Sequence, residues 1–112
     1  MMIELLLRET LTAFLGIDVY LERPDPAPQR YVLLDKTGSG KINKLPSSTV
    51  AFQSYAETLY QAAVLNELVK GAVERLEELP EIGNVRLNSD YNFTDSSTKQ
   101  YRYQAVYDIA HY

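Results

Sequence analysis

The segment TGSGK, residues 37–41, has the glycines and the lysine of a phosphate-binding loop but not the spacing of one. If Lys41 is taken as the lysine of the pattern GxxxxGK, the first glycine falls on Asp35 and the following hydroxyl residue falls on Ile42. Neither residue supplies the tight backbone turn or the magnesium-bound hydroxyl that the loop needs. We therefore expect residues 37–41 to form a flexible hairpin tip.

The segment DYNFTD, residues 90–95, places oxygen donors at alternate positions, as the first half of a calcium-binding loop does. The glycine required at the sixth position is Asp95, however, and the glutamate required at the twelfth is Tyr101. These side chains are better suited to hydrogen bonds with the backbone of a turn. The chain also has no cysteine, which excludes thiolate zinc sites and thiol nucleophiles. We expect no metal and no cofactor.

Two further groups have side chains that could act in catalysis. His111 is the only histidine, and Glu74, Glu77 and Glu78 are close together in the sequence. A catalytic histidine needs a third group that orients it within a formed pocket. Glutamates at this spacing lie on the polar face of the helix expected here, where they are solvated. No set of residues supports catalysis, so we expect a protein that is not an enzyme.

The last strand is unusual because tyrosines occur on both of its faces. Tyrosine and arginine are enriched at the energetic centres of protein interfaces. One interpretation is therefore that another chain covers one face or end of this strand. The subunit or partner interface residues would then be Tyr101, Arg102, Tyr103, Tyr107 and Tyr112. The alternative is a central strand with helices on one face and a partly dry second face. A base-stacking platform is a third possibility.

Composition and charge limit the class of protein. At 112 residues the chain is long enough for one domain, residues 1–112, with its own core. The net charge is −4, and the whole excess lies in residues 54–112, where five Lys and Arg face nine Asp and Glu. Proteins that grip nucleic acid usually carry the opposite sign. No apolar run approaches the roughly 20 residues that span a bilayer, so we expect no membrane segment and no sequence-specific nucleic-acid binding.

The hydrophobic periodicity predicts an α+β fold in the order αβββαββ, with two helices on a mainly antiparallel sheet. The expected elements are a helix over 2–15, strands over 17–22, 31–36 and 48–53, a helix from about 55 to 79, and strands over 85–93 and from about 99 to the end. Gly16 is expected to end the first helix. A proline-rich loop separates the first two strands.

The second helix carries the clearest local signals. Ser54 and Glu57 have the spacing of a capping box, which would begin the helix there. Leu68 is expected on the apolar stripe and Asn66 on the wet face. Gly71 indicates either close packing against the sheet or a tolerated glycine, and both readings stay open.

Two long runs, QSYAETLYQAAVLNELVKGAVERL and VRLNSDYNFTDSSTKQYRYQAVYDIAHY, resemble the small tail-terminator (tail-completion) proteins of long non-contractile-tailed bacteriophages and prophages. The opening helix and VYLERPDPAPQRYVLLDKTG are similar to the same family's pattern of Val-Tyr, a proline-bearing loop and an apolar strand. The resemblance is strongest in residues 53–69 and 87–112. Nothing corresponds to GSGKINKLPSS.

The resemblance implies a non-enzymatic structural subunit that forms a ring, typically a hexamer, on the head-proximal end of the tail tube. Such a ring ends tube polymerisation, contacts the tail tube protein and the head-completion or connector protein, and leaves a lumen for the genome. It also implies a place in the virion after synthesis in the host cytoplasm. A neck component of the same joint and a small ligand-binding module of similar α+β form are the alternatives.

Overall fold

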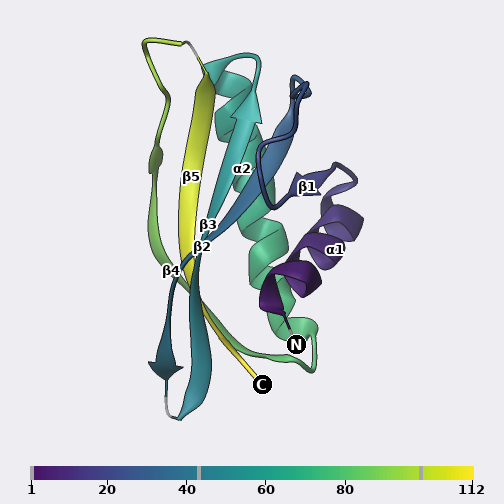
Figure 1. Ribbon diagram of the computed structural model, residues 1–112, viewed down its shortest axis with the longest axis vertical. Coiled ribbons are helices and arrows are strands. Elements are labelled where there is room, and N and C mark those ends of the chain that lie inside the picture. The colour runs from purple at the N-terminus through teal and green to yellow at the C-terminus, as the bar shows by residue number, and fades with distance from the viewer. Residues whose placement is uncertain (1, 43, 99) are drawn as a thin grey trace.

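The computed structural model describes residues 2–42, 44–98 and 100–112, and it confirms the α+β class and the element order (Figure 1). The elements are α1 (Ile3–Leu15), β1 (Val19–Tyr20), β2 (Tyr31–Ile42), β3 (Leu45–Ala56), α2 (Leu59–Glu74), the 3-10 turn η1 (Arg75–Glu78), β4 (Ile82–Asn92) and β5 (Tyr101–His111). The expected start of the last strand, at Lys99, lies outside the described residues.

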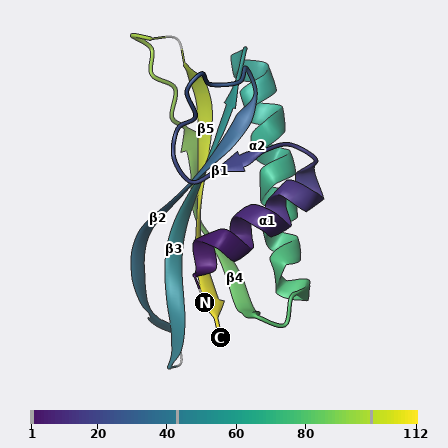
Figure 2. The ribbon, with the colours of Figure 1, turned by 45° about the vertical axis from the view of Figure 1, so that its right-hand side comes forward.

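The five strands form one sheet in the order β1-β2-β3-β5-β4, in which only the β1–β2 pair is parallel. Both helices lie on the same side of the sheet, which leaves the other side without a helix (Figure 2). We call these sides the covered face and the open face. β5 pairs with both β3 and β4, so the closing strand is central.

The core lies between the two helices and the covered face. α1 contributes Ile3, Leu7 and Leu11, which recur on one side of the helix at spacings of four. Burial of these apolar side chains is the main favourable term in folding. Gly16 ends α1 with a φ of 70°, a left-handed conformation that glycine adopts without strain, as expected. The apolar pattern therefore placed the first helix correctly.

The prediction of a capping box at residues 54–57 is wrong. Ser54 is fully buried inside β3, where its backbone pairs with Tyr103. The N-cap is four residues later, at Thr58, whose hydroxyl accepts a hydrogen bond from the backbone N–H of Gln61 at 3.1 Å; the helix begins at Leu59. Thr58 and Gln61 have the same capping-box spacing. Strand pairing with β5 extends β3 to Ala56 and so decides between the two signals.

Two other predictions for α2 are wrong, and the question left open about Gly71 is answered. Asn66 is buried rather than wet, because its amide donates to Asp90 on β4 at 2.8 Å. Leu68 is 51% exposed and does not widen the buried stripe. A Cβ on Gly71 would meet no atom within 4 Å, so close packing does not explain this glycine. The contact between Asn66 and Asp90 joins α2 to β4, and the sequence pattern of the helix alone does not contain that information.

The first two strands also differ in length from the prediction. β1 is only two residues long, Val19–Tyr20. TGSGK is not a hairpin tip, because β2 continues through it to Ile42 after an irregularity between Lys36 and Gly38. Antiparallel pairing with residues 45–49 supplies the hydrogen bonds that hold these glycines extended.

The distal part of the β2–β3 hairpin forms a projection that we call the arm, residues 36–42 and 44–48. It extends beyond the helical layer at the lower end of the molecule (Figures 1 and 2). The molecule is correspondingly elongated, with extents of 42, 24 and 23 Å. The arm is therefore a sheet extension that no helix covers.

Candidate functional site

Aromatic side chains from neighbouring strands line up across one end of the open face. Tyr31 on β2 and Tyr55 on β3 are directly opposite each other, and their rings stack at 4.5 Å with an interplanar angle of 6°. Tyr20 on β1 meets the ring of Tyr31 edge-on at 5.9 Å. Aromatic pairs in these geometries add to the stabilisation that comes from burial. The three strands on this side of the sheet are thereby joined by ring contacts.

Arg102 carries the same row across the rest of the sheet. It is directly opposite Tyr55, and its guanidinium lies 5.6 Å from the centre of that ring. On its other side the guanidinium lies 4.4 Å from the ring of Phe93, which meets Tyr91 of β4 edge-on at 5.7 Å. Cation–π contacts of this kind are favourable. We call this set the aromatic row: Tyr20, Tyr31, Tyr55, Arg102, Phe93 and Tyr91.

Hydrogen bonds hold the centre of the aromatic row in place. Arg102 Nη1 donates to the Tyr55 hydroxyl at 2.7 Å, and Arg102 Nε donates to the backbone carbonyl of Phe93 at 2.7 Å. The Tyr55 hydroxyl donates to Gln53 Oε1 at 3.0 Å. Gln53 Nε2 then donates to Gln104 Oε1 at 2.8 Å. A connected network of this kind fixes the positions of these side chains.

The two halves of the aromatic row differ in exposure. Tyr31 and Tyr55 are only 3% and 6% exposed. They line a cavity of about 220 Å³ together with residues of the proline-rich loop 21–30, and Arg23 of that loop donates to the side-chain amide of Gln100. Burial, and then the neighbouring Tyr55, raise the pKa of Tyr31. Tyr31 and Tyr55 are therefore internal, whereas Tyr20 at the end of the row is partly exposed.

The β4 half of the row remains available on the surface. Tyr91 and Phe93 are 41% and 40% exposed. The Tyr91 hydroxyl accepts a hydrogen bond from Gln104, which ties this edge to the central network. The exposed half therefore presents two rings and the flank of Arg102 on a rigid sheet.

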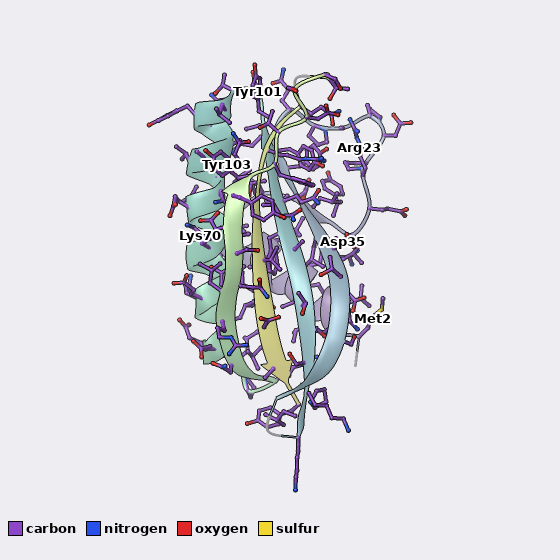
Figure 3. The ribbon with its side chains drawn as sticks, turned by 90° about the vertical axis from the view of Figure 1, so that its left-hand side faces the viewer. Met2, Arg23, Asp35, Lys70, Tyr101 and Tyr103 are labelled. Atoms are coloured by element: carbon purple, nitrogen blue, oxygen red, sulfur yellow. The ribbon has the colours of Figure 1, made fainter. Side chains whose placement is uncertain are left out.

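The structure separates the five residues that the sequence singled out. Arg102 lies on the open face, at the centre of the aromatic row. Tyr101 and Tyr103 are partly exposed toward the upper end of the sheet and alternate onto the covered side of β5 (Figure 3). Tyr112 follows the end of β5 and is 70% exposed. Sequence reasoning thus found one member of the row and three other surface residues.

The prediction that Tyr107 is an interface residue is wrong. Its side chain is 1% exposed beneath α2, where it meets the ring of Phe52 edge-on at 6.0 Å. Its hydroxyl donates to Glu74 Oε2 at 3.1 Å. Burial, and then this carboxylate, raise the pKa of the Tyr107 phenol. The helix that covers this face was predicted, but the sequence did not show which face of β5 it covers.

Five members of the row were missed for different reasons. Tyr20 was taken only as part of the first expected strand, residues 17–22. Tyr55 was assigned to a capping box, and Tyr31 was taken only as part of an apolar strand. Tyr91 and Phe93 were considered only within the turn segment DYNFTD. One signal was detectable in the sequence. Gln53 and Tyr55 are two residues apart, and this spacing places both side chains on one face of a strand.

The other chemical motifs fall into structural roles. Asn92 and Asp95 side chains accept from the backbone N–H groups of Thr94 and Ser97, which confirms the turn reading of DYNFTD. His111 lies 3.0 Å from the hydroxyl of Ser48, and burial lowers its pKa. Within residues 2–42, 44–98 and 100–112, no group of three His, Asp or Glu side chains could hold a metal ion. In the same residues, no helix is long and apolar enough to cross a membrane.

Comparison with known proteins gives no assignment. No protein-family model matches the chain, and no curated protein sequence matches it.

Proposed function

We propose that this chain is a structural virion subunit that forms a ring on the head-proximal end of a phage tail tube. The observation that carries the proposal is the exposed half of the aromatic row. Tyr91, Phe93 and the flank of Arg102 lie together on a sheet face that no helix covers. Tyrosine and arginine are enriched at interface hot spots, where neighbouring chains exclude water. A second protein surface fits this chemistry.

Rigidity of the row favours binding by another protein. Ordering side chains on association costs free energy, and a side chain that is already fixed loses less. Arg102 is fixed by two hydrogen bonds of 2.7 Å, and Tyr91 is tied to Gln104. The exposed rings therefore form a preorganised surface.

The resemblance to tail-terminator proteins is strongest in the segments that build this surface. Residues 53–69 include Tyr55, and residues 87–112 include Tyr91, Phe93 and Arg102. The proposed role follows that family: the ring ends tube polymerisation and docks to the head connector. The genome passes through the lumen, and the acidic second half of the chain reduces its adhesion to DNA.

The experiment compares Phe93→Ala with Tyr60→Ala as a matched control. Phe93 lies in the row, whereas Tyr60 is 78% exposed on α2. Both substitutions remove an exposed ring, so neither should change the melting temperature by more than a few degrees. We expect Phe93→Ala alone to weaken ring formation, measured by mass photometry, and retention on purified tail tubes.

Three outcomes would count against the proposal or redirect it. A wild-type chain that stays monomeric at every concentration and does not bind tail tubes would refute it. Equal effects of both substitutions would remove the aromatic row from the interface. Co-purification with a head-completion protein, without binding to the tube, would indicate a neck component instead.

A further inference from the structure

The arm carries positive charge and no negative charge. Residues 36–48 contain Lys36, Lys41 and Lys44 and no aspartate or glutamate. All three lysines are exposed, and among the described residues none of them lies within ion-pair distance of a carboxylate. In a chain of net charge −4, this is a local reversal of sign on a projecting element.

A negative surface lies where α2 ends. Glu74 is in the last turn of α2, which has no basic residue, and Glu77, Glu78 and Glu81 follow it. The carboxyl end of a helix carries partial negative charge, so glutamates there are unfavourable for the isolated chain. Arg75 offsets only part of this, through Glu78 at 3.5 Å. We call residues 74–81 the acidic turn; an external cation would relieve its charge.

The arm and the acidic turn lie at the same end of the molecule but on different sides. Figures 1 and 2 place both toward the lower end, with the arm extending from the sheet and the acidic turn at the lower end of α2. In a closed ring, neighbours are related by rotation about one axis, so two complementary surfaces must lie at similar heights along that axis. The positions of these two surfaces meet that condition for an axis along the length of the molecule.

We infer that the arm of one copy binds the acidic turn of the next copy, through contacts between the arm lysines and Glu74, Glu77, Glu78 and Glu81. The inference rests on the self-association in the proposed function and adds the surfaces that make it head-to-tail. The occupant of the acidic turn is a second copy of this chain because the chain itself carries the complementary charge on an element that projects. Exposed charge pairs are screened by salt, so the contact weakens as ionic strength rises.

The first test is zero-length cross-linking with carbodiimide, which joins an amine to a carboxylate only when the two are in contact. Equal amounts of unlabelled and ¹⁵N-labelled protein are mixed at low salt, treated and digested. We expect peptides of mixed isotope composition that join Lys36, Lys41 or Lys44 to the acidic turn. Cross-links between these segments found only within one copy would overturn the inference.

The second test reverses the charge on each surface separately. One variant carries Lys36→Glu and Lys41→Glu, and the other carries Glu77→Lys and Glu78→Lys. All four side chains are exposed, so both variants should fold. Each variant alone should assemble at least tenfold more weakly than wild type. A 1:1 mixture should recover assembly, because each arm then meets a turn of opposite charge. Lys36→Arg with Lys41→Arg is the control that keeps the charge.

The outcomes separate this inference from the proposed function. Rings whose stability is unaffected by either reversal would overturn the arm contact and leave the ring intact. Loss of assembly that the mixture fails to restore would also overturn it. If the lysine reversal abolishes retention of a 30-base-pair DNA duplex without changing self-association, the arm binds nucleic acid instead. Failure of the wild type to assemble, with or without tail tubes, would remove the proposed function itself.

Discussion

The two faces of β5 are stabilised by different interactions. On the covered face, Ala105, Tyr107 and Ile109 are 0–1% exposed and pack beneath α2 with the apolar core. On the open face, Arg102 and Gln104 form hydrogen bonds that cross three strands. Burial of apolar area is non-directional, whereas hydrogen bonds require particular partners at particular angles.

This difference explains why tyrosine can occur on both sides of one strand. On the covered face the ring of Tyr107 fills core volume, and only its hydroxyl reaches the Glu74 carboxylate. On the open face, the rings of Tyr55 and Tyr91 accept hydrogen bonds at their hydroxyls and remain part of a polar network. The same residue type therefore fills core volume on one face and takes part in a polar network on the other.

The largest expected effect is that of Tyr107→Ala on the covered face. Truncating a buried aromatic side chain leaves a cavity, and we expect the free energy of unfolding to fall by about 3–5 kcal/mol. Urea denaturation measures this. Tyr107→Phe is the control, because it keeps the ring and removes only the bond to Glu74, at a cost of about 1 kcal/mol. An unchanged unfolding midpoint for Tyr107→Ala would contradict the assignment of this face to the core.

A smaller loss is expected for Arg102→Ala on the open face. Hydrogen bonds to charged groups contribute about 1.5–3 kcal/mol, and partial exposure of Arg102 reduces this to about 1–2 kcal/mol. Arg102→Lys should lose most of the same free energy, because an ammonium cannot replace the forked geometry. In a double-mutant cycle with Tyr55→Phe, we expect coupling of about 0.5–1 kcal/mol. A loss as large as that of Tyr107→Ala would show that the two faces are not stabilised differently.

Gly71→Ala tests the outer side of the helix that covers the sheet. A Cβ at this position meets nothing within 4 Å, so alanine should raise stability by about 0.5–1 kcal/mol through its helix propensity. Gly83→Ala is the contrasting variant, since its Cβ would lie 3.2 Å from Leu45 Cδ1. Thermal melting distinguishes the two. Destabilisation by Gly71→Ala would mean that α2 packs against something on its outer side.

The smallest effect concerns His111, near the lower end of the covered face. Burial and then Lys36 lower the pKa of its imidazole from 6.5. The unfolded chain therefore takes up a proton at a higher pH than the folded chain, so stability is full above about pH 6.5 and falls as the pH drops below it. His111→Gln keeps a polar side chain near Ser48. In this variant the urea midpoint should change less between pH 7.5 and pH 5.5 than in the wild type. An identical pH profile in both proteins would refute this role.

Much of the fold was predictable because its elements carry strong local patterns. The spacing of Ile3, Leu7 and Leu11 placed α1, and Gly16 marked its end. The boundaries that failed are those decided by distant partners. β3 continues through Ser54 because β5 pairs with it, and β2 continues through TGSGK because β3 pairs with it. Backbone pairing between segments overrides a local turn or capping signal when it satisfies more hydrogen bonds.

The candidate site was less predictable than the fold. Arg102 could be chosen because arginine beside tyrosine is typical of interfaces. Its partners, Tyr55 and Phe93, come from segments 47 and 9 residues away along the chain, and no local pattern links them. Two of the arm lysines, Lys41 and Lys44, lie in the segment GSGKINKLPSS, to which no motif and no resemblance gave a function.

The sequence by itself determined the order and type of the elements, the apolar face of α1 and the alternation of β5. It did so because periods of 3.6 and 2 residues are properties of the local backbone. Only the tertiary structure decided which face of β5 lies under α2, which tyrosines are buried, and where the arm lies relative to the acidic turn. These depend on strand order and register, and register is set by contacts between residues far apart in the chain.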